Sequence, residues 1–325
     1  MTLREDDKME SPDMMSMAVT TVIDESLCTG CGLCVKVCPL RTIAVQDGKA
    51  VIVGEASLNC GHCAAVCPVA AIQVKSIDEA LTGFSTFELD PRWLKPGEFD
   101  TGHLVRLMSS RRSCRNFTEK PVDRPLLEDL VKIAITAPSG TNSQKWTFTI
   151  LPTPDAVRSL AVAVARFYEK LNKLAEKRFL RTFLKLIGKP ELDDYYRLYY
   201  QSAVERLAEW KETGRDGVFH GAGAAIVVGS EPGASLPKED AMLATQNILL
   251  AAHSMGLGSC LIGMAVESVN RDRGIKALLG IPDRETVYAI IALGYPDEKY
   301  RGQAGRRKTV MRYAAGGSQD NSRSR

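Results

Sequence analysis

Seven of the nine cysteines in this chain fall between Cys28 and Cys67, at spacings typical of metal ligands. The first run follows the pattern C-x2-C-x2-C-x3-C-P and consists of Cys28, Cys31, Cys34 and Cys38. The second run consists of Cys60, Cys63 and Cys67, and it also ends in a proline. Such short spacings let several thiolates surround one metal centre. The sequence therefore predicts metal or redox chemistry here in place of disulfide bonds.

This cysteine pattern resembles that of the bacterial two-cluster ferredoxins, in which the fourth cysteine of each run reaches the other cluster. The resemblance implies a first cluster, of the 4Fe-4S type, held by Cys28, Cys31, Cys34 and Cys67. It leaves a second cluster with Cys38, Cys60 and Cys63. A zinc site is the alternative, and a complete first run followed by a partner run disfavours it.

Ser57 stands where the second run should carry its first cysteine. A serine hydroxyl is a much weaker acid than a thiol of pKa about 8.5, so it is a poorer ligand for iron. Three arrangements are open. Ser57 ligates as an alkoxide, or water, Asn59 or His62 fills the position, or the corner iron is absent and leaves a 3Fe-4S cluster. We expect an incomplete or labile second cluster, of the 4Fe-4S or 3Fe-4S type.

A compact cationic stretch follows the cysteine region and contains Arg111, Arg112, Ser113 and Arg115. Guanidinium groups form planar forks that suit phosphate oxygens, and a serine hydroxyl adds a donor. The pattern R-x-S-x-R-x-F, followed by Pro121-Val122, resembles the opening of the nitroreductase family, which binds FMN. That resemblance implies that these four residues hold the flavin's phosphate and ribityl chain.

Two further stretches carry the same resemblance. Residues 137–146 read A-P-S-G-T-N-S-Q-K-W, with Lys145 where the family usually has proline. The family's element lines the flavin ring, often from the other subunit, which implies that role for Ser139, Gly140, Asn142 and Gln144. Residues 256–263 resemble a family loop near flavin N5, which implies that role for Ile262 and Gly263. Basic residues close the family's phosphate site, here Arg306 or Arg307.

The elements that must position these groups are predicted from hydrophobic periodicity. Helices are expected over 103–108, 126–137 and 240–255, and strands over 147–150, 226–229 and 287–293. Short strands at 43–45 and 71–74 follow the two cysteine runs, with a turn at Asp47-Gly48. The resemblances imply an α+β chain: a small ferredoxin-like domain, then a mainly antiparallel sheet surrounded by helices.

The expected domain organisation has five parts. They are a disordered tail (1–19), an iron–sulfur domain (20–80), a linker (81–101), an FMN domain (102–313) and a second disordered tail (314–325). A helical insert is expected at 155–215, where the basic stretch RFLRTFLKLIGK could lie on a membrane surface, pack on the domain or cover the flavin. The last two alternatives are favoured.

The overall charge balance excludes some function classes. The 325 residues include 42 basic and 39 acidic side chains, a net charge of +3, which argues against nucleic acid as a partner. No apolar run reaches the ~18 residues of a membrane-spanning helix, and the N-terminus lacks a signal-peptide core. We therefore expect a cytoplasmic protein without a membrane span.

These observations, with the two resemblances, predict an FMN-dependent oxidoreductase, and the nitroreductase resemblance implies a homodimer. Electrons would pass from a donor, ferredoxin or NAD(P)H, through the clusters to FMN. They would then reach a small organic acceptor of the nitroaromatic, quinone or activated-alkene class. No catalytic side chain is assigned, although the insert offers Tyr195, Tyr196, Tyr199 and Tyr200 as proton donors. The alternatives are an NAD(P)H-dependent nitroreductase with accessory clusters, and a redox sensor or electron carrier with little turnover.

Overall fold

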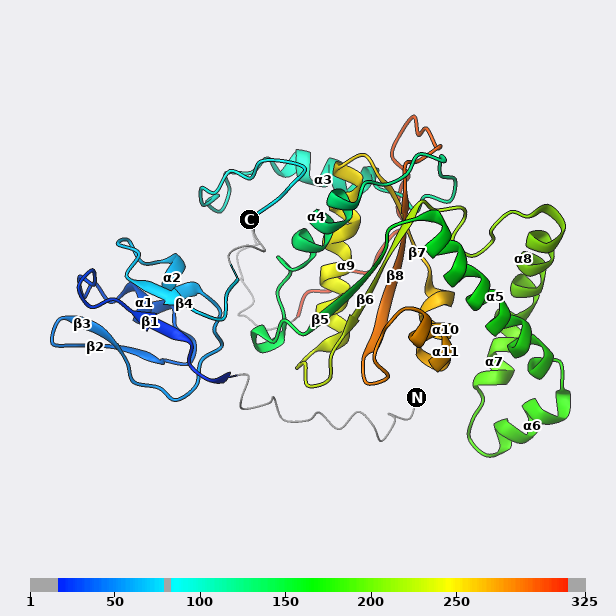
Figure 1. Ribbon diagram of the computed structural model, residues 1–325, viewed down its shortest axis with the longest axis horizontal. Helices are drawn as coiled ribbons and strands as arrows, with labels where there is room; N and C mark the ends of the chain where they lie inside the picture. The colour runs from blue at the N-terminus through cyan, green and yellow to red at the C-terminus, as the bar shows by residue number, and fades with distance from the viewer. Residues whose placement is uncertain (1–16, 79–82, 315–325) are drawn as a thin grey trace, which may run out of the picture.

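The computed structural model describes residues 17–78 and 83–314. The two tails expected at 1–19 and 314–325 lie almost entirely outside these residues. In the described part, a small body formed by residues 17–78 lies beside a larger body built on one sheet (Figure 1). None of the helices in the described part has the length and apolar character that crossing a bilayer requires.

The small body consists of two antiparallel strand pairs and two short helices. Its elements are β1 (Thr21–Ile23) paired with β4 (Ile72–Val74), β2 (Ile43–Gln46) paired with β3 (Lys49–Ile52), α1 (Leu33–Val37) and α2 (His62–Ala65). Asp47 and Gly48 have φ of 48° and 75° and form the tight turn between β2 and β3, as predicted. Gly32 and Gly61 precede the two helices with φ of 73° and 76°. The matching geometry shows that the two halves repeat one unit.

The linker is tied to the larger body at its start. The carboxylate of Asp129 on α4 (Arg124–Ala134) is fully buried and accepts hydrogen bonds from the backbone N–H groups of Ser85 and Thr86, at 2.9 Å and 2.7 Å. Lys132 Nζ donates to the carbonyl of Gly83 at 2.6 Å. Residues 83–86 are therefore fixed to α4, which restricts where the small body can lie.

A four-stranded antiparallel sheet of order β5-β6-β8-β7 organises the larger body, which confirms the predicted α+β class. Its strands are β5 (Trp146–Leu151), β6 (Ala224–Ser230), β7 (Gly258–Leu261) and β8 (Thr286–Gly294). Residues 258–261 were expected to lie in a loop. They instead pair with β8, because Gly258 to Leu261 lie opposite Gly294 to Ile291.

The side chains of the central strands alternate between two separate cores, as the two-residue period of a strand requires. Ile226 on β6 packs with α4 and α9 (Pro237–Ser254) on one face. Its neighbour Val227 packs on the other face, against α5 (Pro154–Ala175), α10 (Gly263–Arg271) and α11 (Arg273–Leu278). Figure 1 shows these two helix groups on opposite sides of the sheet.

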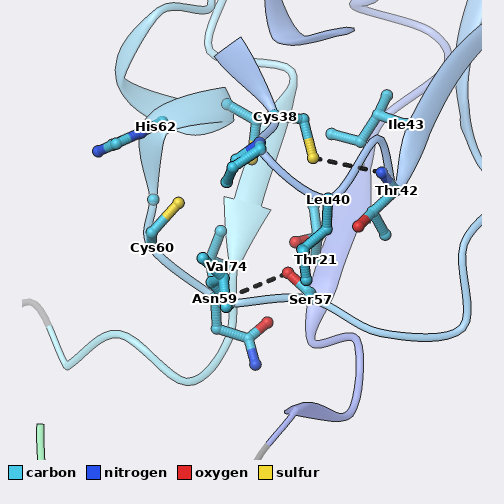
Figure 2. Close-up of a pocket in the computed structure, with 14 residues that line it drawn as sticks. Thr21, Cys38, Leu40, Thr42, Ile43, Ser57, Asn59, Cys60, His62 and Val74 are labelled. Carbon is cyan, nitrogen blue, oxygen red and sulfur yellow. Dashed lines mark hydrogen bonds between the residues drawn. The ribbon is translucent and has the colours of Figure 1, made fainter. Parts of the chain in front are cut away.

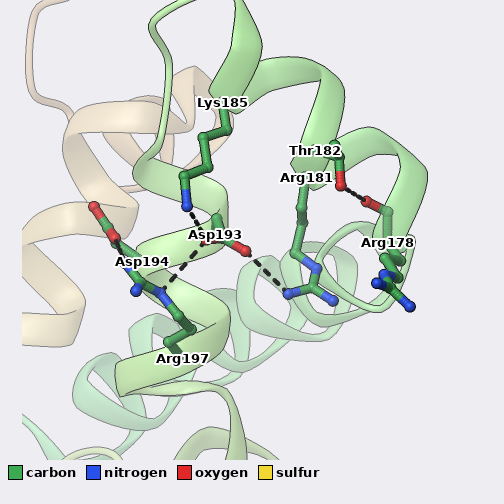
Figure 3. A network of polar contacts seen from close by, with 7 residues as sticks. All are labelled: Arg178, Arg181, Thr182, Lys185, Asp193, Asp194 and Arg197. Carbon is green, nitrogen blue, oxygen red and sulfur yellow. Dashed lines mark hydrogen bonds and ion pairs between the residues drawn. The ribbon is translucent and has the colours of Figure 1, made fainter.

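The predicted insert is helical and contains α5, α6 (Arg178–Leu186), α7 (Glu191–Leu198) and α8 (Tyr200–Thr213). Three cations on α6 and α7 converge on Asp193, and they are Arg181 at 3.2 Å, Lys185 at 3.5 Å and Arg197 at 3.4 Å (Figure 3). These ion pairs hold the polar side of α6 against α7. The apolar side, with Phe179 and Leu186, stays exposed.

Candidate functional site

Two cavities in the small body divide the cysteines between them. One is lined by Cys28, Cys31, Cys34 and Cys67. The other is lined by Cys38, Cys60 and Cys63, together with Ser57. This division matches the two ligand sets that the ferredoxin resemblance implies. The chain folds so that the last cysteine of each run joins the other group.

Backbone N–H groups point at several of these sulfur atoms. Cys28 Sγ accepts hydrogen bonds from Ala50 and Gly30 at 3.3 Å and 3.4 Å, and these bonds lower the pKa of Cys28. Cys38 accepts from Thr42, and Cys67 accepts from Ala71, each at 3.3 Å and four residues along the chain. Such donors stabilise a thiolate, which is the form that binds iron.

Ser57 occupies the position that corresponds to Cys28 in the other half. Its Oγ accepts a hydrogen bond from the N–H of Asn59 at 3.0 Å, just as Cys28 Sγ accepts from Gly30 two residues on. Figure 2 shows Ser57 at the cavity with Cys38 and Cys60, and His62 turned away from it. Ser57 is thus placed like a ligand.

The other two candidates for this position are poorly placed. The amide oxygen of Asn59 accepts from Thr20, and its amide nitrogen donates to the carbonyl of Ala18 at 2.9 Å. The His62 ring is exposed and points outward (Figure 2). Both residues border the cavity, but the Asn59 amide is engaged by Thr20 and Ala18, and the His62 ring points outward.

The arrangement of the cysteine side chains bears on the zinc alternative. Among the described residues, no group of three or more His, Cys, Asp or Glu side chains converges closely enough to hold a single metal ion. In an iron–sulfur cluster each thiolate binds a different iron atom, so the sulfur atoms stand farther apart than the ligands of one zinc ion.

The cationic stretch is held beside the sheet through β7. Ser113 forms a parallel bridge with Ser259, and the N–H of Cys114 donates to the carbonyl of Ser259 at 2.9 Å. A Cβ atom built on Gly258 would lie 2.8 Å from both Cβ and Sγ of Cys114, so glycine is needed for this approach. Cys260 is buried, as expected for a small apolar residue, and burial raises its pKa.

The guanidinium groups of this stretch gather at one cavity, beside the Glu298 carboxylate that accepts a hydrogen bond from the N–H of Arg115 at 3.0 Å. Arg111, Arg112, Ser113, Arg115, Tyr300 and Ala304 line a cavity of about 360 Å³. Burial lowers the pKa of Arg111, and the positive charges of Arg112 and Arg306 lower it further. Within the described ranges, no carboxylate forms an ion pair with these three guanidinium groups. The buried Ser259 Oγ nearby also lacks a partner. Arg306 lies near enough for its charge to lower the pKa of Arg111, although its guanidinium donates to the carbonyls of Ala304 and Gly305; Arg307 beside it is exposed.

The segment Ser139–Gln144 has an unusual backbone that is pinned at both ends. Asn142 and Gln144 have φ of 56° and 48°. The N–H of Gly140 donates to Asp240 at the start of α9 at 2.9 Å, and the N–H of Gln144 donates to Ser139 Oγ at 3.1 Å. These contacts bring all four predicted ring-lining residues together, which makes them one unit.

Asn142 connects this segment to the small body. Its Nδ2 donates to the carbonyls of Leu58 and Asn59, at 2.9 Å and 3.3 Å, and its Oδ1 accepts from Gln144 at 3.0 Å. Leu58 and Asn59 lie between Ser57 and the next cysteine, so the loop around the second cluster position rests on the segment predicted to line a flavin. A cavity of about 760 Å³ lies along this boundary.

Within one chain, the two halves of the predicted flavin site are far apart. The Ser139–Gln144 segment precedes the edge strand β5, whereas Ile262 and Gly263 follow the opposite edge strand β7. Three strand spacings separate these edges by about 14 Å, and the strand ends are offset by about 17 Å along the sheet. The two groups also adjoin opposite faces of the sheet. Ile262 packs with α5 on one face, and Trp146, two residues after Gln144, packs with α9 on the other.

Another cavity, of about 630 Å³, opens beside Gly263 and is covered by the insert. Its lining includes Tyr168, Tyr195, Tyr199, Arg206 and Glu191. Burial raises the pKa of Tyr195 to about 12, so this hydroxyl stays protonated at neutral pH, and it donates to Asn172 Oδ1 at 2.6 Å. The other two predicted tyrosines, Tyr196 and Tyr200, do not line this cavity.

Several residues of these sites carried no usable signal in the sequence. Leu58 contributes only a backbone carbonyl, which no motif reports. Asp240 looked like an ordinary acid in the first turn of a helix, and Tyr300 lay in a basic tail. Arg206 is one of many charges in the insert, and only its place in the cavity distinguishes it.

Comparison with known proteins matches the same two regions. The family model "Nitroreductase family" matches residues 108–295, and the model "4Fe-4S dicluster domain" matches residues 20–79. A putative NADH dehydrogenase/NAD(P)H nitroreductase of Archaeoglobus fulgidus is 28% identical over 60% of this chain and 87% of its own length. An iodotyrosine deiodinase of Thermotoga neapolitana is 28% identical over 65% of this chain and 97% of its own length.

Solved structures are similar to the larger body. A nitroreductase with bound FMN from Desulfitobacterium hafniense DCB-2 is 21% identical, with a TM-score of 0.46, over 65% of this chain and 97% of that one. An iodotyrosine deiodinase bound to FMN and 3-iodo-L-tyrosine is 24% identical, with a TM-score of 0.45, over 65% of this chain and 98% of that one.

The fold and the sequence matches define an oxidoreductase that joins an iron–sulfur domain to a larger catalytic domain. Because the nitroreductase model matches more than half of the chain, the protein belongs to the nitroreductase family. Its dicluster domain precedes the nitroreductase domain, as the cysteine pattern predicted.

Proposed function

We propose that this protein is an FMN-dependent reductase that receives electrons through its iron–sulfur domain and reduces a small organic acceptor. The hydrogen bond from Asn142 to the carbonyl of Leu58 is the observation that carries this proposal. It joins the second cluster position to the segment that resembles the family's flavin-lining element. Iron–sulfur clusters carry single electrons, and bound FMN collects two and can pass them on as a hydride.

The cationic cavity fits the phosphate of FMN. Arg111, Arg112 and Arg306 place positive charges together with no ion-paired carboxylate among the described residues, and a phosphate dianion would offset these charges. Ser113 and Arg115 add donors at the same cavity. Gly263 borders open space. A Cβ atom built on Gly263 would meet no other atom within 4 Å, so the backbone here is accessible from the cavity.

For the iron–sulfur domain we propose the ligand sets that the two cavities define. Cys28, Cys31, Cys34 and Cys67 would hold a 4Fe-4S cluster. Cys38, Cys60, Cys63 and Ser57 would hold the second, with Ser57 Oγ on the corner iron. Because serine is the weaker ligand, this corner would lose iron more readily and give a 3Fe-4S form.

The acceptor would enter the cavity under the insert. The cavity reaches Gly263, and its tyrosine side chains favour a flat aromatic or quinone-like molecule. Arg206 and Glu191 form no ion pair within the described chain and would bind polar substituents of the acceptor. The relatives include a 4-nitrobenzoate reductase and iodotyrosine deiodinases, whose names report aromatic molecules.

A homodimer would complete the flavin site. One chain separates Ser139–Gln144 from Ile262 and Gly263 by roughly 20 Å with the sheet between them. A second copy can bring its own Ser139–Gln144 segment to the flavin. Large apolar side chains remain exposed on α3 (Thr101–Ser110), at Val105 and Met108, and on α9, at Leu243. These side chains suit a subunit interface.

NAD(P)H is the alternative electron donor, and the names of the relatives favour it. Two of them are described as NADH dehydrogenase/NAD(P)H nitroreductase. In that case the clusters would be accessory. A separate alternative is a redox sensor or electron carrier with little turnover. The contact between Asn142 and Leu58 favours the cluster route, because it places the second cluster position against the flavin-lining segment.

The test is an anaerobic mixing experiment with the holoprotein. Reduced ferredoxin, NADH and NADPH are mixed separately with the protein, and flavin bleaching is followed by absorbance. We expect rapid bleaching with ferredoxin and slow bleaching with either nucleotide. Rapid bleaching by a nucleotide alone would overturn the cluster route and leave a conventional flavin reductase.

A further inference from the structure

Each chain supplies two half-sites for a flavin: the Ser139–Gln144 segment, and the phosphate half-site formed by the cationic cavity with Ile262 and Gly263. The position of the second cluster relative to these half-sites determines which flavin it can reduce. Cys60 lies two residues from Leu58, at most about 7 Å along the chain. Leu58 is in turn hydrogen bonded to Asn142 at 2.9 Å. The second cluster position is therefore adjacent to Ser139–Gln144, and it lies on the β5 side of the sheet, as Figure 1 shows for the whole small body.

The phosphate half-site of the same chain lies on the other side. Cys114 is bonded to Ser259 on β7, and Ile262 follows the same strand. A flavin held by Arg111 of this chain would thus lie beside β7, about three strand spacings from β5. The buried sheet and its helices fill the space between. An electron would have to cross that packed core to reach it, and tunnelling weakens steeply with distance.

From this geometry, and resting on the proposed function, we propose that the second cluster of each subunit reduces the flavin whose phosphate is held by Arg111 of the other subunit. The Ser139–Gln144 segment of the first subunit would line that flavin. Asn142 would act as a positioning residue that holds the loop of Leu58 and Asn59 against it. Each subunit would then be an electron donor to its neighbour.

The electron balance needs no further reactant beyond the proposed ones. A reduced one-electron carrier such as ferredoxin is oxidised as it reduces the clusters. Two successive single electrons would pass from the second cluster to a bound flavin, which would take up protons from solvent. The flavin is then reoxidised by the organic acceptor, which gains the two electrons and the protons.

Two matched heterodimers distinguish this cross-subunit route from a route within one subunit. The flavin lesion is Arg111→Ala with Arg115→Ala, and the cluster lesion is Cys60→Ala with Cys63→Ala. In the split heterodimer the two lesions lie on different subunits, and in the stacked heterodimer both lie on one subunit. Each heterodimer keeps one phosphate site and one second cluster, so only their arrangement differs.

Reduced ferredoxin is mixed anaerobically with each heterodimer, flavin bleaching is followed by stopped-flow absorbance, and cluster reduction is followed by EPR. We expect the split form to bleach at the wild-type rate per flavin and the stacked form to bleach at least 100-fold more slowly, with its clusters still reduced. The reverse order of rates would overturn the cross-subunit route. Equal rates, or a protein that is a monomer by light scattering, would overturn it as well.

A milder pair of variants covers the case in which the cysteine changes unfold the small body. One subunit carries only the flavin lesion, so that the dimer holds a single flavin on its wild-type partner. Asn142→Asp, whose carboxylate repels the two carbonyls, is then placed on one subunit or the other. We expect slower bleaching, by about tenfold, only when Asn142→Asp is on the subunit that carries the flavin lesion. Slowing only on the flavin-holding subunit would contradict the proposal. If the wild-type homodimer itself is not bleached by ferredoxin, the proposed function fails first.

Discussion

The N–H of Asn59 donates a 3.0 Å hydrogen bond to Oγ of Ser57, and this contact repeats the bond from Gly30 to Cys28 Sγ in the other half of the small body. The serine is therefore oriented as a ligand, although its chemistry is weaker. Asn59 and His62 border the same cavity, but the Asn59 amide is hydrogen bonded to Thr20 and Ala18 and the His62 ring points outward. We propose that Ser57, as a weaker ligand than cysteine, sets how firmly the second cluster holds its fourth iron.

The first prediction concerns the stability of that cluster. Ser57→Cys should restore a full set of thiolates and keep four irons in the second cluster after mild oxidation. Ser57→Ala should remove the corner ligand and give a 3Fe-4S EPR signal in the protein as purified. Iron content and EPR spectra of the three proteins test this. Identical iron content and spectra for wild type and Ser57→Ala would show that Ser57 is not a ligand.

The second prediction concerns the flavin phosphate. Arg111→Ala removes a partly buried cation from the cavity and should weaken FMN binding by about 10- to 100-fold, since a hydrogen bond to a charged group contributes about 1.5–3 kcal/mol. Arg306→Ala should weaken binding less, because it acts on the same cavity from the exposed C-terminal arm.

The matched control for both variants is Arg307→Ala, which changes an exposed neighbour and should leave FMN affinity unchanged. Fluorescence titration of the apoprotein with FMN gives all the dissociation constants. Wild-type affinity in Arg111→Ala would contradict the phosphate assignment. A large loss in Arg307→Ala would move the closing residue from Arg306 to Arg307.

The third prediction concerns the close approach of β7 to the cationic stretch. Gly258→Ala would put a Cβ atom 2.8 Å from Cys114, so one of the two segments must shift. Overpacking of this kind costs about 1–3 kcal/mol, and the shift should also weaken FMN binding. Gly223→Ala is the control, because its Cβ would meet neighbours at an ordinary 3.6 Å. Thermal unfolding and FMN titration should separate the two variants; equal behaviour would refute this account of Gly258.

The fourth prediction concerns the linker anchor at Asp129. Hydrogen bonds from Thr86 and Ser85 lower the pKa of this buried carboxyl, against the opposing effect of burial. Because the folded pKa is lowered, the anchor is complete above the ordinary value of 3.8 and is lost as the pH falls through the lower folded value. Asp129→Asn should release residues 83–86 at neutral pH.

Hydrogen exchange measured by mass spectrometry tests this prediction. The amides of Ser85 and Thr86 should exchange at least tenfold faster in Asp129→Asn than in wild type near neutral pH. Glu128→Gln, an exposed neighbour paired with Arg124, is the control and should exchange like wild type. Unchanged protection in Asp129→Asn would mean that other contacts hold the linker.

The sequence predicted most of the fold because its signals were local. Helical periodicity located α4 and α9, and the apolar run at 287–293 located β8. The strand β7 was missed, because Gly258 and Ser259 are typical of loops and only pairing with β8 makes them extended. Short glycine-containing edge strands are determined by their neighbours in space.

The candidate site was predicted residue by residue but not as an arrangement. Motif resemblance identified Arg111 and Asn142, yet no local pattern indicates that they lie at opposite edges of one sheet. Nor could sequence show that Asn142 binds the carbonyl of Leu58, since a backbone acceptor has no residue type. Long-range contacts of this kind require the folded chain.

The most direct test of the account is to follow the clusters and the flavin in the same sample. The holoprotein is mixed anaerobically with two equivalents of reduced one-electron ferredoxin per flavin, and cluster and flavin absorbance are recorded together by stopped flow. The account predicts that the clusters are reduced first and then reoxidised at the rate at which the flavin bleaches. Clusters that stay reduced beside an oxidised flavin would contradict it.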